Sequence, residues 1–186
     1  SGERSRERRS AQNAMWHITH SLLRLMAPVL SFTADEAWST FVNDEKDSVL
    51  LHTWYQFPET GHDLLSKWDE LRKLRSTVQK KLEEHRSKGD IGSSLQADVT
   101  LTASGADYDL LNSLDADLRY LLLTSSVDVV KGASSEFGVD VNKNSHQKCE
   151  RCWHYRADVG SVPEHETICG RCVDNLAGGG EQRQYV

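Results

Sequence analysis

The chain has 186 residues and a net charge of −6, from 22 lysines and arginines against 28 aspartates and glutamates. This length suits one ordinary domain or two to three small ones. The acidic balance argues against a general nucleic-acid-binding protein, so any nucleic-acid surface must be a local basic patch. No apolar run approaches membrane-spanning length and no N-terminal hydrophobic stretch suggests export, so we expect no membrane contact. The cysteines, which we expect to be reduced, indicate a cytoplasmic protein.

The first predicted element is a helix from Arg4 to Val29. Its start is crowded with arginines, which the helix dipole disfavours. We therefore expect either that this helix begins further upstream in a longer chain, or that the arginines form a frayed, solvated arm. The apolar residues recur at three- and four-residue steps and define one face: Ala11, Ala14, Met15, Ile18, Leu22, Leu25 and Met26.

A second, shorter helix is predicted after Pro28, which ends the first. Thr33-Ala-Asp-Glu36 has the pattern of a capping box, with Phe32 placed to pack on the following turn. This helix should run from Ala34 to about Phe41. The aromatic run from Val49 to Pro58 that follows is interpreted as an extended strap across the bundle, with Trp54 and Tyr55 either buried there or available to stack on bases.

The longest helix is predicted from Asp63 to Ser87, ended by Gly89 in a left-handed cap. A period-two strand should then run from Leu95 to Thr102. Residues 107–122 are predicted to be helical with Asp115 as a possible N-cap, and Ser126–Lys131 and Phe137–Asn142 are predicted to be short strands. Helix, strand, helix, strand and strand in this order indicate a small α+β unit.

All four cysteines lie in the last forty residues, as Cys149-Glu-Arg-Cys152 and Cys169-Gly-Arg-Cys172 with sixteen residues between the two pairs. This spacing is typical of a four-thiolate zinc site. Gly170 lies inside the second pair, where the backbone must turn sharply and a residue without a Cβ can take a positive φ. Because thiolates fill all four positions of the tetrahedron, no position is left for a reactive water, and we predict one structural Zn²⁺.

Two other interpretations of the cysteines are a pair of disulfides and a redox pair. Four cysteines in 186 residues are far from a disulfide-dense scaffold, and a redox C-x-x-C occurs singly beside a βαβ pattern. His146, His154 and His165 are near enough in sequence to replace a ligand, but we expect them to be exposed or to lie around the ligands. Zinc binding can contribute about 10 kcal/mol to the folding of such a short module.

No catalytic constellation or Gly-rich phosphate loop is evident, but three stretches together resemble a known family. They are Arg8–Gln12 with Met26–Trp38, Leu82–Ala97, and Lys148–Tyr155 with Ile168–Asn175 and Gly180-Glu181. The first is similar to the end of the helical anticodon-binding domain of class Ia aminoacyl-tRNA synthetases. The last, which is the most specific, resembles the zinc tail of bacterial isoleucyl-tRNA synthetases, and the resemblance covers essentially the whole chain.

The resemblance implies a C-terminal, tRNA-holding part of an ATP-dependent isoleucine–tRNA ligase. The family's His-Ile-Gly-His and Lys-Met-Ser-Lys-Ser motifs do not occur in this sequence, and His17-Ile-Thr-His20 lacks the glycine. We therefore assign no catalytic residues, and we expect this chain alone neither to activate isoleucine nor to hydrolyse mischarged valine. The expected partners are isoleucine tRNA and the remainder of the same synthetase chain, and we expect a monomer.

The zinc module in this family is understood to help hold tRNA near its anticodon. The resemblance therefore implies that Arg151 and Trp153 are presented rigidly by the first pair of cysteines, the arginine toward phosphate or base edges and the tryptophan toward an unpaired base. Arg171 and Arg183 are weaker candidates. The alternative for Trp153 is packing over the zinc cluster.

Two other functions are considered. One is a nucleic-acid-binding zinc finger of the formamidopyrimidine-DNA glycosylase type, which would need a Pro-Glu at the mature N-terminus. The other is a zinc-dependent protein-interaction module, which would show no salt-sensitive RNA binding.

The predicted architecture has several modules: part of an α-helical bundle, a small α+β unit and a C-terminal zinc knuckle (or ribbon) with four cysteine ligands. The expected boundaries are residues 1–60 for the end of the anticodon-binding bundle and 61–131 for the long helix with the α+β junction. Residues 132–147 are expected to form a short β segment and linker, and residues 148–186 the zinc module.

Overall fold

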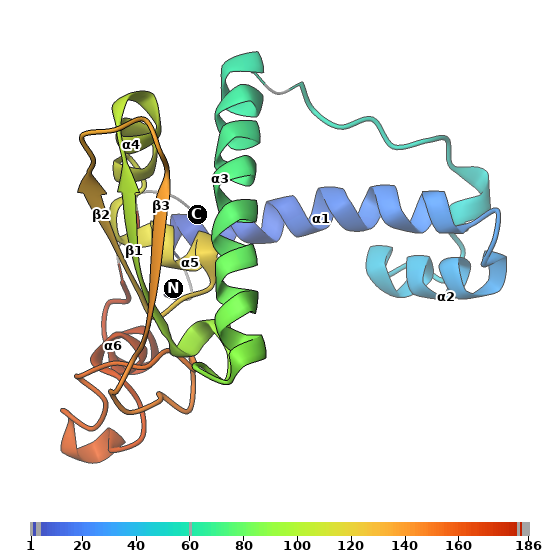
Figure 1. The fold of residues 1–186 in the computed structure, drawn as a ribbon. Coiled ribbons are helices and arrows are strands. Elements are labelled where there is room, and N and C mark those ends of the chain that lie inside the picture. The colour runs from blue at the N-terminus through green and yellow to red at the C-terminus, as the bar shows by residue number, and fades with distance from the viewer. Residues whose placement is uncertain (1, 3–4, 60, 182, 184–186) are drawn as a thin grey trace. The chain divides into compact units, whose positions relative to one another are not determined.

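The structure is a computed structural model that describes residues 2, 5–59, 61–181 and 183. It divides into two compact units, one of Arg6–Thr60 and one that takes in Gly61–Val186 with Ser1–Ser5. Each unit has its own helices: in Figure 1 those of the first unit are blue, and those of the second unit run from green to red. Among the described residues, no helix combines the length and the apolar character needed to cross a membrane.

The helical unit consists of α1 (Arg6–Met26), α2 (Ser31–Val42) and a short 3-10 turn, η1 (Val49–Leu51). Arg4, which we placed at the start of the first helix, lies outside the described residues. Trp38 is fully buried, and its indole Nε1–H donates to Asp47 Oδ2 at 3.0 Å. The small core of this unit consists of Leu23, Ala27, Ala34, Trp38 and Val49.

The predicted apolar face of α1 is largely exposed in this structure. Met15, Ile18, Leu22 and Leu25 each leave more than half of their surface open to solvent, and only Leu23 of this helix is buried. The periodicity that predicts a helix is therefore correct about the conformation. The same periodicity does not identify which side chains of α1 are buried.

The predicted capping box is wrong. The chain leaves α1 in a hydrogen-bonded turn, with Leu30 N–H donating to Met26 O at 2.8 Å. Helix α2 consequently begins at Ser31, so Thr33 is already inside it, and the N-cap residue Leu30 makes no side-chain capping bond. Phe32 is 93% exposed and does not pack on the following turn.

The aromatic run after η1 is not buried throughout. Tyr55 is half-buried, its ring stacked on His20 with centroids 5.2 Å apart. Trp54, by contrast, is 62% exposed, so the prediction of a buried strap is wrong at this residue.

The second unit contains the longest helix, α3 (His62–Lys88), and a three-stranded sheet. Helix α3 ends at Lys88, and Gly89 forms the predicted left-handed cap, with φ +83° and its N–H directed at the carbonyls of Arg86 and His85. Strand β1 (Ala97–Ala103) is central, parallel to β2 (Ser126–Lys131) and antiparallel to β3 (Gly138–Lys143). Figure 1 shows the three strands side by side.

The core of this unit lies where α3 meets the sheet and the helices that connect β1 to β2. Alternate residues of β1 are fully buried, as the period-two pattern predicts. The largest fully buried side chains of this core come from α3, β1, α4 (Gly105–Asn112) and α5 (Leu118–Leu122): Leu71, Val78, Val99, Leu101, Leu111, Leu118 and Leu122.

The predicted single helix over residues 107–122 is interrupted. Helix α4 ends at Asn112, and a 3-10 turn, η3 (Asp115–Asp117), precedes α5. Asp115 has φ +42°, a left-handed conformation that Asp tolerates better than most residues, and this breaks the helix. Asp115 therefore does not cap a helix as predicted, and no side chain caps α5.

Candidate metal centre

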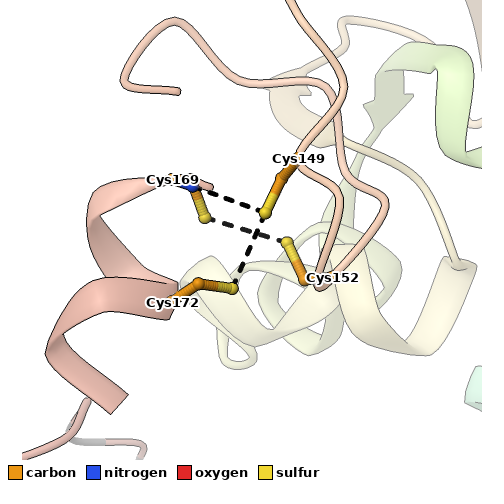
Figure 2. A group of neighbouring side chains, drawn as sticks. All are labelled: Cys149, Cys152, Cys169 and Cys172. Carbon is orange, nitrogen blue, oxygen red and sulfur yellow. Dashed lines mark hydrogen bonds between the residues drawn. The ribbon is translucent and has the colours of Figure 1, made fainter. Parts of the chain in front are cut away.

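The four cysteines converge on one point in the second unit (Figure 2). Cys149 and Cys152 come from a loop, whereas Cys169 and Cys172 lie at the start of α6 (Gly170–Ala177). Cys149, Cys169 and Cys172 are completely buried. In the part of the chain that the structure describes, this is the single cluster of His, Cys, Asp or Glu with the geometry to hold a metal.

The first pair sits in a tight turn closed by backbone hydrogen bonds. Trp153 N–H donates to Cys149 O at 2.9 Å, and Cys149 N–H donates to His154 O at 2.9 Å. Trp153 takes φ +66°, the left-handed region that non-glycine residues rarely adopt. The turn thereby aims both sulfurs inward and leaves the residues between and after them on its outer side.

The second pair begins a helix, and Gly170 does not take the positive φ that the sequence suggested. The glycines of the described chain with positive φ are elsewhere, at residues 89, 105, 160 and 180. A Cβ at Gly170 would meet Asp158 Oδ2 at a tight 3.1 Å, so the glycine gives this carboxylate room to approach the start of α6. The Gly170 N–H points at that same oxygen, 3.2 Å away.

The spacing of the sulfurs fits zinc. Cys149 Sγ and Cys172 Sγ are 3.8 Å apart, as are Cys152 Sγ and Cys169 Sγ, and all four atoms lie within 4.8 Å of one another. A tetrahedron with Zn–S bonds of about 2.3 Å has edges of about 3.8 Å. The residues therefore fit one structural Zn²⁺ held by four thiolates, with no coordination position left for water.

The pKa values of the thiols differ across the cluster. Burial raises the pKa of Cys169 to about 12 and also raises that of Cys172. Burial opposes ionisation of Cys152 too, but hydrogen bonds from His154 and Arg171 outweigh it and lower the pKa of Cys152 to about 5. Thiolate ligands buried at this density need a cation to offset their charge, which is what zinc supplies when bound.

The three nearby histidines do not join the cluster. His146 is exposed, and His154 and His165 are half-buried. His154 Nδ1 lies 3.1 Å from Cys152 O, and the ring also hydrogen-bonds the Cys152 thiol, but among the described residues the metal-binding cluster consists of the four cysteines.

The predicted tRNA contacts fall into two pairs. Arg151 is exposed on the first turn, and Trp153 is 58% exposed with Lys148 Nζ 5.3 Å from its ring centroid. This exposure leaves much of the Trp153 side chain open to solvent. Arg171 and Arg183, in contrast, have side chains only 16% and 22% exposed, and both donate to Glu181.

Two residues that the sequence analysis did not single out as site residues organise this region. Tyr120 of α5 accepts a hydrogen bond from Arg171 Nη1 at 2.8 Å, and Glu181 accepts from the same atom at 3.0 Å. Gly180-Glu181 is part of the stretch that resembles the zinc tail of isoleucyl-tRNA synthetases, but this resemblance by itself indicates no role for the Glu181 carboxylate. No sequence signal links Tyr120 to Arg171, 51 positions later, so only the fold brings them together.

Comparison with known proteins agrees with this geometry. Residues 147–175 match the family described as "Zinc finger found in FPG and IleRS", and residues 1–101 match the "Anticodon-binding domain of tRNA ligase". The zinc-finger description covers two enzyme classes. The relatives that match the whole chain belong to the second, which removes the glycosylase interpretation.

Three relatives, each named isoleucine–tRNA ligase, illustrate the similarity. The protein of Janthinobacterium sp. (strain Marseille) is 56% identical over 100% of this chain and 20% of its own length. Those of Nitrosomonas europaea and Aromatoleum aromaticum are 53% and 50% identical, over 96% and 98% of this chain, and again over 20% of their own lengths.

The chain thus spans about a fifth of the length of the curated relatives it matches. The anticodon-binding match covers more than half of its residues, and the cysteine cluster lies inside the zinc-finger match. The chain therefore belongs to the family of anticodon-binding domains of tRNA ligases, and it carries a structural zinc finger of the type found in isoleucyl-tRNA synthetases.

Proposed function

We propose that this chain is the tRNA-holding part of an isoleucine–tRNA ligase, the class Ia enzyme that attaches isoleucine to its tRNA with ATP. The proposal is supported by at least 50% identity over nearly all of the chain to proteins of that name. In this proposal the partners are isoleucine tRNA and the remainder of the synthetase, the protein is a cytoplasmic monomer, and the chemistry belongs to regions outside this sequence.

The zinc module is proposed to help hold the anticodon region of the tRNA. The observation that carries this is the exposed Trp153 ring on a turn that four sulfurs hold rigid, next to the exposed Arg151. Single-stranded loops are commonly read by aromatic rings that stack on unpaired bases and by arginines that contact phosphates or base edges. A preformed ring loses little conformational freedom on binding, so its stacking energy is retained.

The proposed contacts differ in strength. Arg151 and Trp153 are the principal candidates, because both residues are exposed, although the Arg151 side chain also hydrogen-bonds Cys172. Arg171 and Arg183 stay weaker candidates, since their guanidinium groups are already paired with Glu181. We also propose the module boundaries given above, with the zinc module starting at Lys148, where an isolated β-bridge to Tyr155 closes the first turn.

The test is a titration of isoleucine tRNA, and of a non-cognate tRNA, into the zinc-loaded chain with and without a chelator. We expect salt-sensitive binding that prefers isoleucine tRNA and disappears on chelation. Equal binding of both tRNAs, or none with zinc confirmed bound, would show that the module does not read the anticodon without the rest of the enzyme. Zinc-dependent binding of a protein partner alone would favour the interaction-module alternative.

Trp153→Ala sharpens the test, with Trp153→Phe as its conservative counterpart. Base–aromatic stacking is worth about 1–3 kcal/mol, so Trp153→Ala should weaken binding by about 5- to 150-fold. Trp153→Phe should retain much of the affinity. Arg72→Ala removes an exposed charge from α3 without removing an aromatic ring, and it should leave the preference for isoleucine tRNA unchanged.

A further inference from the structure

Tyr120 lies where three parts of the second unit meet. Its ring is 5.7 Å from that of His154, which follows the exposed Trp153 in the first cysteine turn. The guanidinium carbon of Arg171 in α6 is 5.2 Å from the Tyr120 ring centroid, and that of Arg183 in the C-terminal tail is 4.3 Å away. One side chain of α5 thus contacts both halves of the zinc module and the tail behind it.

Arg171 connects this tyrosine to Glu181. Its Nη1 donates to Tyr120 Oη at 2.8 Å and to the two carboxylate oxygens of Glu181 at 3.0 and 3.1 Å. The Arg171 and Glu181 side chains are only 16% and 13% exposed. Such a shielded ion pair is costly to break from one side, because the remaining charge stays buried without its partner.

The tail returns to α6 so that Glu181 can reach this position. Gly180 takes φ +82°, which reverses the chain after the helix. The Glu181 N–H then donates to Asn175 Oδ1 at 3.3 Å, and Asn175 Nδ2 donates to Arg171 O at 2.9 Å. The carboxylate is therefore placed by backbone and side-chain contacts and is not a loose surface charge.

A separate contact joins the other edge of the zinc module to the sheet. The Tyr155 N–H donates to Ser125 Oγ at 2.7 Å, and Ser125 directly precedes β2. If the contacts of Tyr120, Arg171 and Glu181 were lost, this edge would remain as a hinge. The module could then rotate while its four cysteines stayed together.

We propose that Tyr120, Arg171 and Glu181 form a latch that fixes the direction in which the zinc module projects from the sheet. The three act as positioning residues for the exposed Arg151 and Trp153, whose role rests on the proposed function. The effect of the latch on orientation does not depend on that role. Arg171, placed between two zinc ligands in sequence, acts from inside the module.

The test measures orientation directly, by residual dipolar couplings of the zinc-loaded chain. Amides of the three strands and of the two cysteine turns should fit one common alignment tensor. In Glu181→Gln, which keeps the volume but removes the charge, and in Tyr120→Phe, which removes only the hydroxyl, the turns should need a tensor of their own. Glu164→Gln, which neutralises an exposed carboxylate of the same module, should keep the common tensor.

Tyr120→Phe decides the proposal, because Tyr120 makes no hydrogen bond to a cysteine and its loss of a hydroxyl leaves the ring in place. A common tensor in zinc-loaded Tyr120→Phe would overturn the latch. The double variant should deviate no more than the larger of the single variants, since Tyr120 and Glu181 share Arg171 as a partner and also contact each other directly. Failure of wild-type tRNA binding would count against the proposed function and leave these couplings unaffected.

Discussion

The two units stabilise themselves in different ways. The helical unit buries five hydrophobic residues and leaves an apolar stripe of α1 exposed. The second unit buries a continuous core between α3 and the sheet, and adds a sulfur cluster where its last residues are too polar to form a core. The helical unit therefore has a small apolar core, and the α3–sheet region of the second unit has a large one. In the cysteine-containing segment, metal coordination takes the place of an apolar core.

Removal of zinc should have the largest effect and should be confined to the zinc module. A chelator, or Cys172→Ser, removes a contribution of about 10 kcal/mol to folding of this segment. We expect amide signals of residues 148–177 to collapse toward unfolded positions in NMR spectra, while those of β1 and α3 persist. Collapse of the sheet signals at the same chelator concentration would show that the core and the metal site are not separable.

A leucine pair tests the packing difference between the units. Leu101 in β1 is fully buried and Leu22 in α1 is 51% exposed. Leu101→Ala should lower the free energy of unfolding of the second unit by about 2–5 kcal/mol. Leu22→Ala should change the stability of the helical unit by less than about 0.5 kcal/mol. Urea denaturation followed by NMR signals of each unit measures both, and equal effects would contradict the comparison.

The smallest predicted effect concerns Asp47 in the helical unit. Hydrogen bonds from Trp38 and then from His52 hold the pKa of Asp47 below its ordinary value of 3.8. Because folding lowers this pKa, the stabilisation is present above about pH 3.8 and is lost as pH falls below it. Side-chain NMR titration should show the low pKa, and His52→Gln should raise it. Asp47→Asn should lack this acid-dependent loss, and an unshifted pKa in the wild type would contradict the assignment.

Local patterns in the sequence predicted local features well. The alternation in β1 requires only that one face be buried, and the C-x2-C spacing requires only a tight turn, so Val99, Leu101 and the four cysteines were identified correctly. Gly89 was likewise predictable, because a helix end followed by glycine is a local signal.

Features that depend on distant residues could not be read in this way. The exposed stripe of α1 has the same period as a buried one, so Leu22 could not be distinguished from Leu23 by its type. The interruption at Asp115 and the early start of α2 are set by competing turns whose hydrogen bonds only the folded chain reveals. The contact of Tyr120 with Arg171 joins residues 51 positions apart.

The left-handed backbone at Trp153 has a further consequence. For a residue with a Cβ, this region costs about 1–2 kcal/mol, whereas glycine adopts it without that penalty. Replacing this tryptophan with glycine would therefore remove the conformational strain from the turn that carries Cys149 and Cys152. The same change would remove the exposed aromatic ring of that turn. At this position the backbone conformation favours glycine, whereas the proposed stacking on a base requires the indole ring. Folding stability and tRNA recognition therefore favour different residues at position 153.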